Sequence, residues 1–131
     1  MNTIKATIRH LQSSEGISIV HFDVLGEAMR MMALDLDKGL AKGKEVVIGV
    51  KATNIALALE KNSGLSISNQ LEVTISKIDL GDLLCCVTFT FHNETWESVI
   101  TRDSALRLDF KVGARVVALV KSSELSIVEV L

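Results

Sequence analysis

Alternation of apolar and polar residues is the dominant pattern along this chain, and it predicts β-strands. Apolar residues occupy every second position over residues 71–75 and 87–91, and residues 20–24 repeat this pattern in the first half. A period of two is typical of half-buried strands. Two runs, Val46–Val50 and Val116–Val120, are apolar without interruption, which favours strands buried on both faces.

One segment predicts a helix. Thr101 has the side chain of an N-cap, Asp103 places an acid in the first turn, and the following residues through Leu108 form one or two helical turns. In the first half, Asp35 and Asp37 before Lys38-Gly39-Leu40 mark the corresponding place. We therefore expect a short helical turn in each half.

The two halves are related by duplication. A spacing of 67 residues aligns their early parts, and after a short insertion a spacing of 70 aligns Gly43 with Gly113 and Val50-Lys51 with Val120-Lys121. The pairs at the first spacing include Asn2/Asn69, Thr7/Thr74, Ile8/Ile75, Val20/Val87 and Phe22/Phe89. Two diverged copies of one small module therefore stand in tandem.

A polar segment, Glu60–Gly64, separates the copies and predicts a linker. We expect a first module at residues 1–60, a linker at 61–67 and a second module at 68–131. Modules of this size are near the limit at which one core is stable, so we expect contacts between copies or chains. The elements predict an all-β fold of two tandem OB-like five-stranded barrels, each with a short helical turn.

Composition narrows the function classes. The mean hydropathy is +0.36, but the longest apolar runs are far shorter than the roughly 20 residues of a spanning helix. No signal peptide is visible, so we expect a cytoplasmic protein without membrane insertion. The net charge of −2 and the 4% of aromatic residues disfavour nucleic-acid binding. The adjacent Cys85 and Cys86 form no disulfide framework, which agrees with a reducing compartment.

Three stretches of the second copy form a set with a known counterpart. They are Ser66–Leu71, Val99–Ser104 and Val116–Ser123, and together they resemble the molbindin module, also called the Mop or TOBE domain. That family opens with Ser-Ala-Arg-Asn-x-Leu, has a central Ile-Thr-x-Glu-Ser, and closes with an apolar strand running into Lys-Ala-Ser. The first copy carries the closing element as Val50–Ile55. The strand into Lys-x-Ser/Thr, present in both copies, is the most specific part.

The resemblance implies a tandem di-Mop protein that binds molybdate or tungstate at interfaces between modules, with six modules around the threefold axis of a homotrimer. Molybdate is a tetrahedral dianion with only acceptor oxygens, so its site must supply hydroxyls, amide N–H groups or an ammonium. A turn at a strand end can form such an anion-binding concavity. The donors expected in the second copy are Lys121, Ser122, Ser123, Ser66, Ser68 and Asn69. Those in the first copy are Lys51, Ala52 through its amide, and Thr53.

The chain departs from the family pattern at two places. Ser68 stands where the family has Arg, which removes a planar positive group suited to a dianion. Ile19 in the first copy and Cys86 in the second stand at an Asn position of the family. Altered specificity and loss of binding are the two alternatives that these differences leave open.

Other candidate chemistry is weaker. Cys85-Cys86 and His92 lack a familiar metal-ligand spacing, and Cys85 is in phase with the core. The segment Gly39–Glu45 resembles a phosphate loop but has one residue too few between its glycines and no Ser or Thr at its end. Met29 aligns with Trp96, which favours core or interface packing. The ligand spacing thus predicts no metal site. No nucleophile paired with a general base is apparent, so we expect no catalysis.

The sequence thus predicts a protein for storage or homeostasis of molybdate or tungstate that associates with itself. The alternative is a ligand-sensing or oligomerisation module associated with a molybdate-responsive regulator or an ABC importer ATPase. Met1 begins directly at the first strand, with no helix-turn-helix or ATPase before it, which favours storage if the chain is complete. An OB-fold nucleic-acid binder is a third reading, which the charge disfavours.

Overall fold

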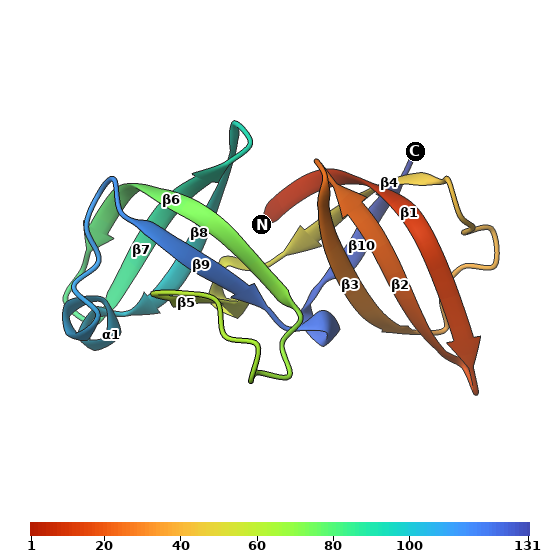
Figure 1. Ribbon diagram of the computed structural model, residues 1–131, viewed down its shortest axis with the longest axis horizontal. Helices are drawn as coiled ribbons and strands as arrows, with labels where there is room; N and C mark the ends of the chain where they lie inside the picture. Colours follow the sequence, from red (N-terminus) through yellow and green to blue (C-terminus); the bar gives the residue numbers. More distant parts are fainter.

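A computed structural model describes all residues, 1–131, and contains two five-stranded antiparallel sheets that lie side by side (Figure 1). The first sheet contains, in spatial order, β10 (Ser126–Val130), β4 (Glu45–Val50), β1 (Asn2–Ser14), β2 (Ile17–Val24) and β3 (Glu27–Leu34). The second contains β5 (Ile55–Ala58), β9 (Arg115–Val120), β6 (Asn69–Leu80), β7 (Leu84–Phe91) and β8 (Glu94–Thr101). The helical elements are α1 (Arg102–Arg107) and the 3₁₀ turns η1 (Ala52–Asn54) and η2 (Ser122–Glu124). The nearly all-β prediction is confirmed, and the two sheets agree with an OB-like fold.

Each half gives its last strand to the other half. β5 pairs with β9, with Ile55 opposite Val120, and β10 pairs with β4, with Ser126 opposite Gly49. In Figure 1 the blue strand β10 therefore lies in the half of the molecule that contains β1 to β4, at the edge of their sheet. The division of the chain at 1–60, 61–67 and 68–131 describes the repeat in the sequence but not the sheets. Residues 55–58 lie in the second sheet and 126–130 in the first, because β4 and β9 each take a partner from the other half.

The buried apolar side chains of both halves form one continuous core. Val116–Val120 is buried along its whole length, as the uninterrupted apolar run predicts. Met29 and Trp96 are 0% and 1% exposed, and Trp96 Nε1 donates to the Thr3 carbonyl at 3.1 Å. Cys85 is fully buried in the same core. A shared core explains how two modules of marginal size are stabilised.

Helix α1 is present where its cap predicts, but the first half has no counterpart. Thr101 Oγ1 accepts from the Ser104 N–H at 3.1 Å. Leu34 occupies the equivalent position and has no acceptor, and the segment that follows is three residues shorter. The chain there forms turns, one of them closed by Gly39 N–H donating to Asp37 Oδ1 at 2.9 Å. The expected helical turn at Asp35–Leu40 was therefore wrong. None of the helices has the length and apolar character needed to span a membrane.

The aligned glycines have a backbone role. Gly43 and Gly113 both have φ of 90°, a conformation that side chains with a Cβ rarely adopt. Their N–H groups donate to the carbonyls of Ile8 and Ile75 at 2.7 and 2.8 Å. These bonds hold the loops that lead into β4 and β9, so the two central strands enter their sheets in the same way.

Candidate functional site

The two Lys-x-Ser/Thr motifs lie at the ends of the central strands β4 and β9. Lys51 and Lys121 keep an extended backbone, with φ and ψ of −70° and 143° and of −62° and 137°, before the chain enters η1 and η2. Asn54 N–H donates to the Lys51 carbonyl and Glu124 N–H to the Lys121 carbonyl, both at 2.9 Å. The motifs therefore share one backbone geometry, and their differences lie in the surrounding side chains.

The two turns η1 and η2 are in direct contact. Asn54 Nδ2 donates to Glu124 Oε2 at 2.9 Å. These residues occupy equivalent positions in the repeat, 70 residues apart. The structure thus brings the two motifs together where the halves meet. The repeat marks Asn54 and Glu124 as equivalent but contains no signal of their contact.

Ser68 lies beside the second motif. Asn69 pairs with Val120 between β6 and β9, so the preceding Ser68 is the neighbour of Lys121 across the sheet. On the other side of β9, Ile55 pairs with Val120, which brings η1 to the same strand end. Ser66 lies in the exposed linker, and its side chain makes no hydrogen bond within the chain.

The side chain of Asn69 has a structural role. It is 1% exposed, and its amide donates to the carbonyls of Arg30 at 2.8 Å and Val120 at 3.0 Å. Its Oδ1 accepts from the Arg30 N–H at 2.7 Å. An amide group has two hydrogens, so none is left for an anion. Asn69 is therefore not available as the side-chain donor that the sequence predicts, because it fastens β3 to the end of β9.

Asn2 makes the equivalent contact from the first half to the second half. We call each of these asparagine contacts with an outer strand a clamp. Its Nδ2 donates to the Glu97 carbonyl and its Oδ1 accepts from the Glu97 N–H, both at 2.8 Å. Asn2 and Glu97 are the repeat equivalents of Asn69 and Arg30 respectively. The first residue of β1 therefore holds the outer strand β8 of the other half, and the first residue of β6 holds the outer strand β3.

The remaining candidate donors are free. Lys51 and Lys121 form no ion pair. The exposed members of the two motifs are Lys51, Thr53, Lys121 and Ser123, and the half-buried ones are Ala52 and Ser122. The main hollows of the surface are lined by other residues. In a single chain the motifs thus form an exposed set of hydrogen-bond donors.

The thiols and carboxylates form no metal centre: no group of three or more His, Cys, Asp or Glu is placed to hold a metal ion. Burial, with a smaller contribution from Asp79, raises the pKa of the Cys85 thiol. Burial and the nearby Glu97 carboxylate raise the pKa of Cys86. Both thiols are therefore protonated at neutral pH, which disfavours nucleophilic chemistry.

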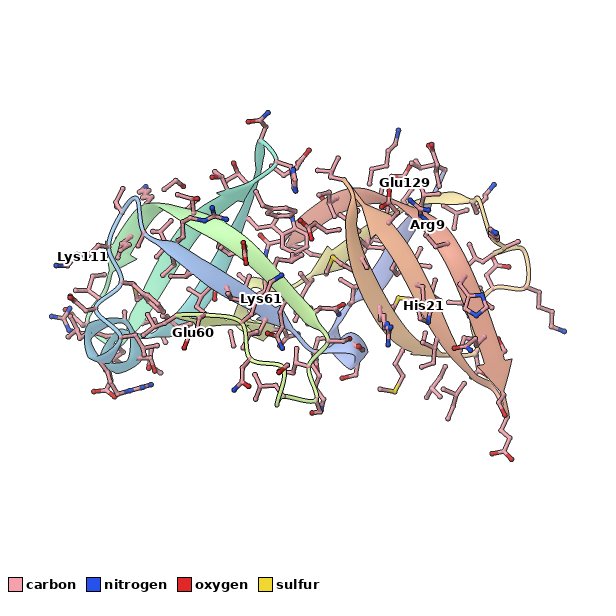
Figure 2. All side chains as sticks on the ribbon, in the orientation of Figure 1. Arg9, His21, Glu60, Lys61, Lys111 and Glu129 are labelled. Carbon is pink, nitrogen blue, oxygen red and sulfur yellow. The ribbon has the colours of Figure 1, made fainter.

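Three nitrogen-bearing side chains lie in a row on the outer face of the first sheet. His10, His21 and Arg30 are paired across β1, β2 and β3, and the two imidazole rings are 5.4 Å apart. Figure 2 shows His21 on this face. Burial lowers the pKa of His21, and the positive charges of Arg30 and His10 lower it further. The Arg30 guanidinium therefore extends along this face rather than into the core.

Comparisons with known proteins bear on the family and the fold. Residues 65–127 match the family model of the TOBE domain. The whole chain is similar to the crystal structure of the cytoplasmic molybdate-binding protein ModG with molybdate bound, at 26% identity and a TM-score of 0.87. The match covers 95% of this chain and 93% of that one. No curated protein sequence matches. These likenesses support the Mop/TOBE family and an OB-like fold.

Proposed function

We propose that this protein is a cytoplasmic tandem di-Mop protein that binds molybdate or tungstate for storage or homeostasis. The observation that carries the proposal is the juxtaposition of two equivalent motifs, Lys51–Thr53 and Lys121–Ser123, whose donors are free. The likeness along nearly the whole chain to a protein with molybdate bound supports the same ligand class.

The donors suit a tetrahedral dianion. At the second motif, the Lys121 ammonium and the hydroxyls of Ser68, Ser122 and Ser123 offer hydrogens to acceptor oxygens. At the first motif, Lys51, the Ala52 N–H and the Thr53 hydroxyl have the equivalent roles. The chain has a net charge of −2, so attraction for the anion comes from these local groups rather than from the overall field.

We place the anions at interfaces between modules of a homotrimer. On a single chain the motifs face water, which weakens each hydrogen bond to an anion, and a second wall would exclude that water. Apolar side chains for such contacts are available on the surface. Leu34, Leu83 and Val112 are 74%, 81% and 63% exposed.

Isothermal titration with molybdate, tungstate and sulfate tests the ligand. We expect heat with molybdate and tungstate, and about tenfold weaker binding in K121Q, because one charge-assisted hydrogen bond is lost. K111Q is the matched control, since Lys111 lies at the far end of the second sheet (Figure 2). The absence of heat with all three anions at millimolar concentration would overturn the proposal.

Light scattering after gel filtration tests the assembly. We expect a mass three times that of the 14.2 kDa chain, and a stable monomer that still binds molybdate would contradict sites between chains. Substitution of the exposed Leu83 by Glu should lower the mass if that side chain lies in a chain contact.

A further inference from the structure

Arg30 of the first half lies next to the second motif. The Asn69 amide binds the backbone of Arg30 at two points and also the carbonyl of Val120, the residue before Lys121. A single side chain thus spans the distance from Arg30 to the end of β9. The turn η2, which contains Ser122 and Ser123, also packs against β3.

Glu97 occupies the equivalent place beside the first motif. The Asn2 side chain binds the backbone of Glu97 at two points. Asn2 itself pairs with Val50, the residue before Lys51. The backbone arrangement around the two motifs is therefore similar, although only Asn69 also binds the carbonyl of the central strand. The neighbouring side chain is positive at the second motif and negative at the first.

The Arg30 side chain has no partner within the chain. It is exposed, and it forms neither an ion pair nor a side-chain hydrogen bond. Its neighbours on the sheet face are His21 and His10, and the nearest acid on β2, Asp23, is paired with Arg9 at 3.3 Å. No carboxylate therefore competes for the guanidinium.

The other charge at the junction is Glu124, which Asn54 holds between the two turns. Glu124 belongs to η2, where it reduces the positive charge at the second motif, and its equivalent in η1 is the neutral Asn54. At the second motif Lys121 and Arg30 outweigh Glu124, whereas at the first motif Lys51 is balanced by Glu97. A dianion is therefore favoured at the second motif.

We propose that Arg30 donates its guanidinium to an oxyanion bound at the second motif, and that Glu97 makes the first motif the weaker of two unequal sites. A guanidinium presents donors in a planar fork that matches two oxygens of a tetrahedral anion, whereas a carboxylate offers no hydrogen and repels it. Arg30 thereby belongs to a site whose other donors come from the opposite half of the chain. This inference rests on the proposed function.

Titration of the full chain with sodium molybdate tests the inequality. Wild type should show a tight and a weak class of site. R30Q should weaken the tight class about tenfold, as expected for one charge-assisted hydrogen bond. E97Q should strengthen the weak class and leave the tight class unchanged. R107Q is the matched control, because it removes the same group from α1, distant from the motifs (Figure 1), and should change neither class by more than about twofold.

R30Q should not change the stability of the fold, because the bonds between Asn69 and residue 30 involve only the backbone of residue 30. Thermal melting without anion should therefore be the same for R30Q and wild type. The Arg30 side-chain Nε resonance should shift when molybdate is added to wild type. If wild type binds and R30Q binds equally well, the role of Arg30 is overturned while the proposed function stands. If wild type binds neither molybdate nor tungstate, the proposed function fails and this inference with it.

Discussion

The two halves of the molecule share a backbone frame and differ in the side chains at their contacts. Gly43 and Gly113 have the same φ, and Asn2 and Asn69 make the same type of clamp. The clamped residues, Glu97 and Arg30, have opposite charges. Positions that the backbone geometry requires are thus the same in both halves, while positions that set local charge have diverged. This difference in charge is the basis on which we propose two sites of different strength.

The largest expected difference between the halves lies in the core. W96A should cost about 3–5 kcal/mol and M29A, at the equivalent position, about 2–5 kcal/mol of unfolding free energy. We expect W96A to be the larger, because Trp96 also donates to Thr3 and packs against Phe91 with ring centroids 5.3 Å apart. Urea denaturation measures both, and a larger loss in M29A would contradict the comparison.

The clamps come next in magnitude. N69A leaves three backbone groups without their partner, and N2A leaves two. At about 1 kcal/mol for each bond, N69A should cost about 3 and N2A about 2 kcal/mol. Amide hydrogen exchange provides a local test, since protection at Arg30 should fall in N69A and protection at Glu97 in N2A. Equal exchange in both variants would show that the clamps do not hold the outer strands.

The helix cap should have a smaller effect. T101A removes the acceptor for the Ser104 N–H and should cost about 1 kcal/mol. L34A changes the equivalent, exposed position of the first half, where no helix follows, and should change the stability by less than about 0.5 kcal/mol. Urea denaturation with circular dichroism compares the two, and an equal loss would show that α1 gains nothing from its cap.

The smallest effect is a pH dependence confined to the first half. The folded state lowers the pKa of His21 below its ordinary value of 6.5, so the unfolded chain binds more protons in the window beneath that value. Stability should therefore fall as the pH drops below about 6.5, and H21Q should reduce this fall. In R30Q the pKa of His21, measured by NMR titration, should rise. The second sheet has Thr88 at the equivalent position, so exchange at acid pH should increase in β2 rather than in β7.

Local patterns predicted much of the fold and the strand ends at which the two candidate motifs lie. The alternation over residues 87–91, the apolar run Val116–Val120 and the Thr101 cap all describe interactions within a few residues, and the structure confirms each. The helical turn expected at Asp35–Leu40 was wrong, and the physical reason is that Leu34 has no side-chain acceptor to cap a helix. The placement of Lys51 and Lys121 at strand ends followed from the same apolar runs.

The strands, the repeat and the equivalence of the two motifs could be read from the residues alone, because periodicity and turn residues act through near neighbours. Three features depend on long-range packing: β5 and β10 change sheets, the Asn69 amide is fully hydrogen-bonded, and Arg30 lies beside the second motif. An alternation of apolar residues indicates that a strand has one buried face, but it does not indicate which other strand pairs with it. Pairing between strands that are distant in the chain depends on the unpaired sheet edges and on the shared core, which form only when both halves pack together.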